Sequence, residues 1–530
     1  MIRPAFERLR DHVRCRPAGT AAALGAVLAA TMCAAAASAQ TQHALRYPPT
    51  QRDSVVDDYF GTKVPAPYRW FEHDNSADVA GWVEAQNPVT QAYLAQIPLR
   101  AELQTRLTAL WNYEKVGVPY RQAGHLFFSR NSGLQNQSVL YEQDAAAGEP
   151  RALLDPNTLS PDGSTALAGS AASPNGQYLA YGLSQGGSDF EELHVRSLGD
   201  GHDLADTVHW VKFSGIAWTN DNRGFFYSRF PAPAPGQALT AAAVNQKVYY
   251  HVVGTPDSTD RVIYQRPDLP DWFIGANVTD DGRFVFITLV HGTETKNQVF
   301  YMDLKDPAHP DLSAPVLPLI AQGDAEYAPL GNDGDTVFLQ TTYQAPNRKI
   351  IAIVLPDTAR AHWRTVVPEA KNVIESSALA GGHVVAQYLE DVSSHLRIFG
   401  TDGSAQGQVS LPGIGTVGGL SGRMDTPELF YAFTSFLYPA TIFRYDFTTR
   451  RSEAFQTPHV AFDPSRYETR QVFYRSKDGT RVPMFITAAR GIKLDGSHPT
   501  VLYAYGGSDI SSLPSFSRVT AAWLERGGMY

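Results

Sequence analysis

The sequence of 530 residues predicts a seven-bladed β-propeller held between two parts of an α/β domain. Three observations predict this arrangement: a repeat of short aromatic strands in the middle of the chain, amphipathic helices before it, and a hairpin, strand and helix after it. We therefore expect an N-terminal helical part at 40–115, the propeller at 116–461 and the start of an α/β domain at 462–530.

Residues 1–39 have the features of a secretory signal peptide. Five arginines precede an apolar, alanine-rich run from about Gly19 to Ala37, and Ala37-Ser38-Ala39 matches the A-x-A cleavage pattern. A retained anchor is disfavoured because the run is short and consists mostly of alanine. We expect cleavage after Ala39, a periplasmic or secreted protein, and no stable membrane anchor.

The composition argues against disulfides, nucleic-acid binding and a metal site. Both cysteines, Cys15 and Cys33, lie in the leader, so the mature chain would need no disulfide in an oxidising compartment. Removing the five leader arginines together with Glu7 and Asp11 changes the net charge from −9 to about −12, which disfavours nucleic acid as a partner. The fifteen histidines show no H-E-x-x-H and no paired ligand spacing, and no cysteine of the mature chain could join them, so we expect no metal site.

Two helices are expected in the N-terminal part. The first, SADVAGWVEAQNPVTQAYLAQ, follows the N-cap residue Ser76 and contains Pro88, so either two helices or one kinked helix would fit. The second, LRAELQTRLTALW, begins at Leu99 and places its leucines on one stripe.

The middle of the chain repeats a turn followed by an apolar, aromatic strand. The repeats start 45 to 60 residues apart, at GHLFFSR, NGQYLAYG, DNRGFFYS, DGRFVFIT, DGDTVFLQ, GGHVVAQY and TPELFYAF. A second strand follows each of them, so seven units of roughly fifty residues fit one four-stranded blade each. A pair of unrelated β-sandwiches is the alternative, which the unbroken repeat disfavours.

The repeat also decides the role of GLSQG at Gly182–Gly186, which matches the G-x-S-x-G nucleophile elbow of serine hydrolases. An elbow requires a helix directly after the serine, whereas the residues after Ser184 lead into another strand of the same unit. We expect a Gly/Ser-rich hairpin here and assign no nucleophile.

After about Phe462 the pattern changes to that of an α/β sheet. A hairpin turning at Lys477-Asp478-Gly479-Thr480 precedes a buried strand, Thr500–Tyr505, that ends in glycines. An amphipathic helix follows, with an apolar face formed by Val519, Ala522 and Trp523. Such a sheet cannot be complete at Tyr530, so we expect the sequence to be a fragment.

Six stretches carry a resemblance to a known family. They are DDYFGTKVPAPYRWFE, SGLQNQSVLYEQ, VKFSGIAWTNDNRGFFYS, FTSFLYPATIF, SKDGTRVPMFI and KLDGSHPTVLYAYGG, and they cover the chain from about Tyr47 to its end. In these stretches the sequence resembles the prolyl oligopeptidase family of serine peptidases. The resemblance implies an α/β-hydrolase domain built from both chain ends, with a seven-bladed propeller inserted between them.

The resemblance also implies an activity, hydrolysis of short peptides on the carboxyl side of proline through an acyl-enzyme. It places the catalytic Ser, Asp and His beyond this sequence, and it implies an oxyanion-stabilising role for Tyr505. A phenol at the end of a strand can donate to a developing oxyanion, although Tyr505 or Tyr503 could equally be packed under the following helix. The implied partners are short proline-containing peptides, no cofactor is implied, and we expect a monomer.

One departure from the family concerns the substrate site. Ser508 stands where the family usually has a phenylalanine that lines the proline pocket, which makes strict proline specificity less secure. Two alternatives stay open: a non-catalytic propeller that binds a peptide or protein, and a related dipeptidyl or acylaminoacyl peptidase.

Overall fold

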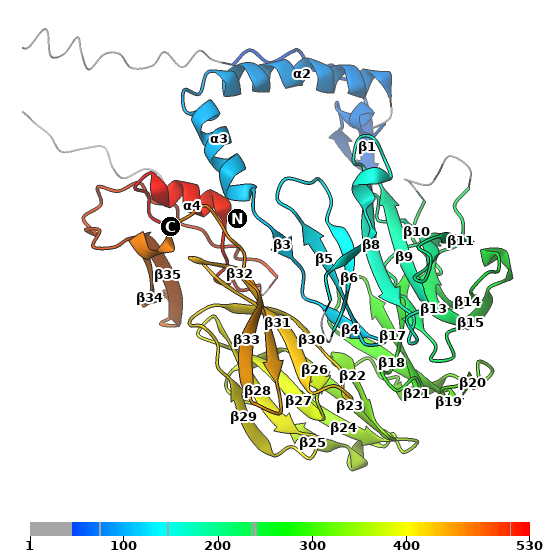
Figure 1. Ribbon diagram of the computed structural model, residues 1–530. Coiled ribbons are helices and arrows are strands. Elements are labelled where there is room, and N and C mark those ends of the chain that lie inside the picture. Colours follow the sequence, from blue (N-terminus) through cyan, green and yellow to red (C-terminus); the bar gives the residue numbers. More distant parts are fainter. Residues whose placement is uncertain (1–44, 74–75, 146–147, 235–236, 238–240, 509) are drawn as a thin grey trace, which may run out of the picture. The chain divides into compact units, whose positions relative to one another are not determined.

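The computed structural model describes residues 45–73, 76–145, 148–234, 237, 241–508 and 510–530 (Figure 1). The expected signal peptide, its cleavage site and both cysteines lie outside the described residues. The chain divides into two compact units, Met1–Ala101 and Glu102–Tyr530.

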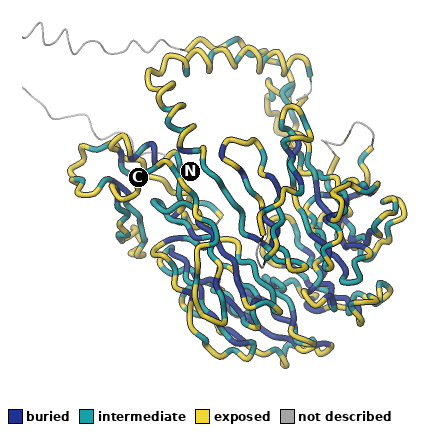
Figure 2. The backbone as a smooth tube through the Cα atoms, in the orientation of Figure 1, coloured by how far each residue is buried: buried dark blue, intermediate teal, exposed yellow. Residues whose placement is uncertain are grey.

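The first unit combines a small hairpin with a long helix. Strands β1 (Val56–Tyr59) and β2 (Thr62–Pro65) are antiparallel, and a 3-10 helix, η1 (Arg69–Glu72), follows them. Helix α2 (Ala77–Ala95) is exposed along its length (Figure 2). Ser76 caps it, because its side chain accepts a hydrogen bond from the backbone N–H of Val79 at 3.3 Å.

Helix α2 settles the alternative that the sequence left open, because it runs through Pro88 as one helix. Helix α3 (Arg100–Trp111) then leads into the second unit, as the leucine stripe predicts. Among the described residues, no helix has both the length and the apolar character that a membrane crossing requires.

The second unit consists mainly of antiparallel sheets whose strands follow one another along the chain (Figure 1). A five-stranded sheet contains β3 (Lys115–Val116), β4 (Tyr120–Gln122), β5 (His125–Asn131), β6 (Val139–Asp144) and β7 (Arg151–Leu154). An eight-stranded sheet contains β8 (Thr165–Ala172), β9 (Tyr178–Gln185), β10 (Glu191–Ser197), β11 (Asp203–Val211), β12 (Ala217–Trp218), β13 (Gly224–Arg229), β14 (Lys247–Val252) and β15 (Arg261–Gln265).

Four sheets of four strands complete the series. The first two contain β16 (Trp272–Val278), β17 (Phe284–His291), β18 (Asn297–Asp303) and β21 (Leu317–Ile320), then β22 (Tyr327–Asp333), β23 (Thr336–Thr341), β24 (Lys349–Val354) and β25 (Arg364–Val367). The last two contain β26 (Val373–Ala380), β27 (His383–Glu390), β28 (Ser393–Gly400) and β29 (Ala405–Val409), then β30 (Thr416–Gly422), β31 (Glu428–Ser435), β32 (Tyr438–Asp446) and β33 (Arg451–Gln456). A two-stranded hairpin, β19 (Lys305–Asp306) and β20 (His309–Pro310), lies between β18 and β21 in the chain.

The prediction of seven separate four-stranded blades is wrong. Five sheets have the size of a blade, whereas β8–β15 form one continuous sheet of eight strands. The junction lies between β11 and β13, which pair through Val211 and Arg229. These are the last residues of the two strands, and the backbone N–H of Phe230 donates to the carbonyl of Trp210 at 3.1 Å, so the ladder continues across the junction. The repeat in the sequence marks individual strands, but not the places where one sheet stops.

The core of the second unit lies between successive sheets. Aromatic and branched side chains from neighbouring sheets form clusters in which Phe284, Tyr327, Phe338 and Tyr431 are almost fully buried. The series closes on itself, because Leu126 and Phe128 of β5 pack against Phe430 and Ile442 of the last sheet. Each sheet therefore buries both faces against neighbours, as a propeller requires.

The predicted α/β domain is not formed by the described residues, and this prediction is wrong for the structure. Strands β34 (Tyr467–Arg475) and β35 (Arg481–Ala489) form a two-stranded sheet, with the predicted turn at 477–480. Only three α-helices are present in the described residues: α2, α3 and α4 (Arg518–Glu525).

The strand predicted at Thr500–Tyr505 is also absent. Thr500 makes a single parallel bridge to Met529, and residues 501–506 take no regular secondary structure. Leu502 is 83% exposed, because these residues have no strand on their other side to cover the apolar run. On α4 the predicted face is partly wrong: Ala521, Ala522 and Leu524 are buried, whereas Val519 is 58% exposed.

Candidate functional site

The residues for which the sequence predicts a catalytic or substrate-binding role lie together in one exposed loop. Tyr505 is 58% exposed and Tyr503 is 60% exposed, so neither is packed under α4 as the structural alternative required. Ser508 is also exposed and has a φ of +52°, a left-handed conformation that favours glycine. The loop therefore presents a phenol and a hydroxyl to solvent; their roles stay predictions.

The structure gives Ser184 no part in nucleophilic catalysis. Ser184 lies in β9, opposite Glu191 of β10 and Ala166 of β8. Gly186 and Gly187 form the turn that follows, with positive φ values, and the chain continues into β10 instead of a helix. The prediction of a hairpin at GLSQG is confirmed.

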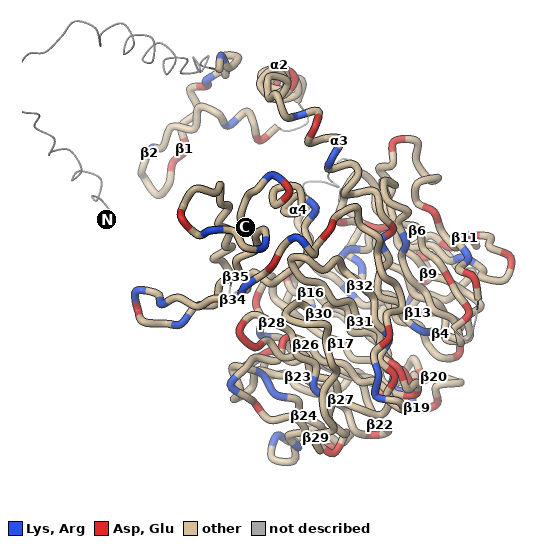
Figure 3. The backbone as a smooth tube through the Cα atoms, turned by 60° about the vertical axis from the view of Figure 1, so that its left-hand side comes forward, with Lys and Arg blue, Asp and Glu red and all other residues tan. Residues whose placement is uncertain are grey.

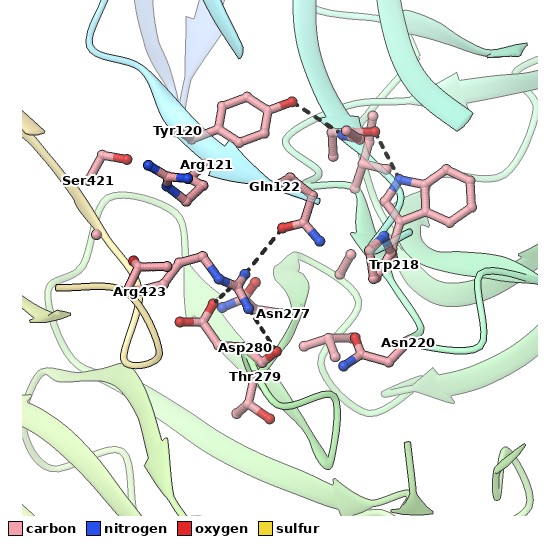
Figure 4. Close-up of a pocket in the computed structure, with 18 of the residues that line it drawn as sticks. Tyr120, Arg121, Gln122, Trp218, Asn220, Asn277, Thr279, Asp280, Ser421 and Arg423 are labelled. Carbon is pink, nitrogen blue, oxygen red and sulfur yellow. Dashed lines mark hydrogen bonds and ion pairs between the residues drawn. The ribbon is translucent and has the colours of Figure 1, made fainter. Parts of the chain in front are cut away.

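A polar pocket that the sequence did not predict lies where the ends of five inner segments meet (Figure 4). Its volume is about 270 Å³. It is lined by Tyr120, Arg121 and Gln122 of β4, by the end of β8, by β12, by residues 277–280 at the end of β16, and by 421–423 at the end of β30. These segments come from the first, second, third and last sheets, so the pocket lies where the two ends of the series meet, and we call it the axial pocket.

Arg423 contacts three of the segments around this pocket. Its guanidinium donates to Oε1 of Gln122 at 3.2 Å and to the backbone carbonyl of Asp280 at 3.2 Å. It also pairs with the carboxylates of Asp280 at 3.4 Å and Asp425 at 3.0 Å. A single side chain thus connects the β30–β31 loop with β4 and with the segment after β16, as the dashed lines of Figure 4 show.

The carboxyl of Asp280, which lines the pocket, has a raised pKa. The pocket walls desolvate its carboxyl and raise the pKa, against the lowering effect of the Arg423 guanidinium and of a backbone hydrogen bond from Met424. Solvent still reaches 44% of the side chain, so this desolvation is partial. The pocket combines hydrogen-bonding groups with balanced charges, which suits a polar ligand better than an apolar one.

Glu428 lines the pocket and joins the two ends of the propeller. Its buried carboxylate, 4% exposed, accepts hydrogen bonds from the Nε atoms of Arg121 in β4 and Arg444 in β32. The bond from Arg444 is 2.7 Å long. Since Arg121 belongs to the first sheet and Glu428 to the last, this ion-pair cluster closes the ring beside the apolar contact of β5 with β31.

The sequence did contain a signal for this pocket. The turns Thr279-Asp280-Asp281-Gly282 and Thr219-Asn220-Asp221-Asn222 precede equivalent aromatic strands in the repeat. In both, a threonine hydroxyl bonds the aspartate two residues on at 2.6 Å. Turns at the same place in successive repeats must lie at the same end of the sheets, so their polar side chains meet there.

Within the described ranges, the His, Cys, Asp and Glu side chains form no group of three that could hold a metal ion. Figure 3 shows Lys and Arg interspersed with Asp and Glu over the turns, including the tip of the β34–β35 hairpin.

The sheets closed into a ring, the axial pocket and the exposed tyrosine loop define a β-propeller protein that carries further polypeptide at both ends of the propeller. A family profile described as prolyl oligopeptidase, N-terminal beta-propeller domain, matches residues 48–458. The chain belongs to the prolyl oligopeptidase family. The match begins before the first sheet of the second unit, so the expected domain boundaries at 115/116 and 461/462 stay predictions.

Similar proteins support the same assignment. The chain is 39% identical over 504 residues to a prolyl endopeptidase of Elizabethkingia meningoseptica, covering 95% of this chain and 70% of the relative. It is 32% identical over 518 residues to a dual function macrocyclase-peptidase of Amanita bisporigera, with coverages of 91% and 70%. A solved structure of prolyl oligopeptidase B from Galerina marginata, bound to a macrocyclization substrate, matches with a TM-score of 0.83 at 31% identity, covering 91% of this chain and 71% of that one.

Proposed function

We propose that this chain belongs to a serine endopeptidase that cleaves short peptides on the carboxyl side of proline. The observation that carries the proposal is the identity of 39% over 504 residues to a prolyl endopeptidase, because that match extends over 95% of the chain. The proposed reaction is acyl-enzyme hydrolysis, in which a serine attacks the scissile carbonyl and a histidine transfers the proton.

In this proposal Tyr505 donates a hydrogen bond to the oxyanion. Its exposure supports the role, since the phenol is not used by another group of the core and can reach a substrate. Ser508, three residues later in the same loop, would contact the proline side chain of the substrate. The polar hydroxyl offers less apolar area than an aromatic ring, so discrimination for proline over alanine would be weaker.

The nucleophile, the aspartate and the histidine are proposed to lie outside residues 1–530. The placement of Ser184 within a hairpin supports this, as does the absence of a strand–turn–helix elbow at any described serine. The proposed site of action is the periplasm or the exterior of the cell, reached through the leader at 1–39, and the proposed state is a monomer.

The test compares two proteins on two substrates: the protein encoded by the whole gene and the isolated chain 1–530, each with a chromogenic Gly-Pro anilide and its Gly-Ala counterpart. We expect the first protein to cleave the proline substrate preferentially and the isolated chain to cleave neither. Equal rates on both substrates would refute proline specificity. Turnover by the isolated chain would refute the placement of the nucleophile.

A further inference from the structure

A buried charged cluster lies at the junction of the eight-stranded sheet, away from the axial pocket and from the Tyr505 loop. His251 of β14 is fully buried, with its Nε2 2.9 Å from Oδ1 of Asp206 in β11 and its Nδ1 2.9 Å from Oδ1 of Asp260. Asp260 directly follows the 3-10 helix η3 (Asp257–Thr259) and also accepts a hydrogen bond from the hydroxyl of Tyr227 in β13 at 2.7 Å.

The geometry points to a doubly protonated imidazole. A neutral histidine carries one N–H and one bare nitrogen, whereas here both ring nitrogens face a carboxylate oxygen at hydrogen-bond distance. Only the imidazolium donates in both directions. Burial alone would lower the pKa of His251, but the hydrogen bonds and charges of Asp206 and Asp260 outweigh it and raise the pKa to about 9.

The cluster crosses the junction between β11 and β13, where the sheet has a single ladder pair. Strands β11 and β13 share the pair Val211–Arg229, whereas β13 and β14 are paired along all of β13, from Gly224 to Arg229. Side-chain contacts hold β11 elsewhere: Oδ1 of Asp206 also accepts the backbone N–H of Gly254 at 2.6 Å. We name the set Asp206, Tyr227, His251 and Asp260 the seam cluster.

Other charged groups face the seam cluster from each packed element. His209 of β11 contacts the Asp257 carboxylate at 3.0 Å, and Arg229 of β13 pairs with the same carboxylate at 3.0 Å. The Arg229 guanidinium also lies 6.0 Å from the Tyr227 ring. Burial and Asp260 raise the pKa of Tyr227, so this hydroxyl keeps its proton and goes on donating in alkaline solution. As the pH rises, the His251 imidazolium therefore loses its proton before the Tyr227 hydroxyl does.

Losing that proton leaves two carboxylates facing one neutral ring inside the protein. The second oxygen of Asp206 is buried without a hydrogen-bond partner among the described residues, so the charge of Asp206 is compensated only through Oδ1. A buried carboxylate without a counter-charge is strongly destabilising. Water reaches this carboxylate when β11 separates from β13 and β14, which breaks one ladder pair, the bond of Asp206 to Gly254 and the apolar packing of Val208 and Val211 against β13.

We propose that the protonated His251 is a pH-sensitive clasp of the eight-stranded sheet, and that its deprotonation opens the seam between β11 and β13 while the other sheets stay folded. The clasp stabilises the seam fully below about pH 6.5, the ordinary pKa of histidine, and this stabilisation is lost as the pH rises through about 9.

The test is hydrogen–deuterium exchange of the purified protein from pH 7 to pH 10, corrected for the intrinsic rate of exchange. We expect peptides covering β11 (203–211) and 247–254 to gain roughly tenfold in relative exchange for each pH unit from pH 7 up to the pKa of His251, and to level off above it. Peptides of β22–β29 should keep their protection. Uniform protection across the sheets over this range would overturn the proposal.

A matched pair of variants separates the clasp from general alkaline effects. D206N keeps an oxygen acceptor but removes one charge, so the opening should move to lower pH. The control is D271N: His291 also lies between two carboxylates, Asp271 at 2.9 Å and Glu294 at 3.0 Å, but on the surface. D271N should leave the opening of β11 unchanged. Equal shifts of the pH of opening in both variants, or no shift in D206N, would overturn the proposal. If D206N does not fold, the exchange of the wild-type protein decides alone.

Discussion

The closure of the propeller ring gives the most quantitative prediction. Glu428 lies in the last sheet and is 4% exposed, while its partners Arg121 and Arg444 are 22% and 46% exposed. Removing one member of a fully buried ion pair costs about 3–5 kcal/mol. Because both arginines can be rehydrated, we expect E428Q to lower the free energy of unfolding by less, about 2–3 kcal/mol.

Urea denaturation followed by tryptophan fluorescence measures this change. The control is E453Q, because Glu453 is an exposed carboxylate paired across the ladder with the same Arg444. We expect the control to change the free energy of unfolding by less than about 0.5 kcal/mol. If the free energies of unfolding of E428Q and E453Q agree within error, the ion pairs around Glu428 do not hold the first and last sheets together. The ring would then close through apolar contacts alone.

The remaining predictions concern the apolar closure and the tyrosine loop. F430A removes a ring that is 2% exposed and should lower the free energy of unfolding by about 3–5 kcal/mol in the same assay. The control F473A removes a ring that is 36% exposed and should lower it by about 1 kcal/mol or less. Similar losses for the two variants would contradict closure of the ring by β5 and β31. Y505F, in the protein encoded by the whole gene, should lower kcat about 10²–10³-fold on a proline substrate with little change in KM, and an unchanged kcat would exclude the oxyanion role. S508F should lower KM for proline substrates by an amount equivalent to about 1 kcal/mol, and an unchanged KM would place this residue outside the proline pocket.

Local sequence signals predicted the elements that depend on local physics. The Ser76 cap and the leucine stripe predicted α2 and α3, because capping and helical spacing act within a few residues. The turn-and-strand repeat predicted the antiparallel strands for the same reason. The repeat could not show that β11 and β13 would pair, since that depends on where the last residues of two separate strands lie in the folded chain.

Features that depend on distant segments were missed. The run Thr500–Tyr505 has the composition of a buried strand, but its burial requires neighbouring strands that the described residues do not supply. The axial pocket is lined by residues between 120 and 430, so no single stretch of the sequence predicts it. The same applies to the seam cluster, where Asp206 and His251 lie 45 residues apart in the chain.

The central claim is that the protein is a proline-directed peptidase whose chemistry uses the Tyr505 loop. The most direct measurement is the rate of cleavage of a Gly-Pro anilide by the protein encoded by the whole gene, with and without Y505F. The account predicts cleavage after proline by the wild type and a loss of about 10²–10³-fold in kcat for the variant. Absence of cleavage by the wild type would contradict the proposed activity, and cleavage that is indifferent to Y505F would contradict the proposed site.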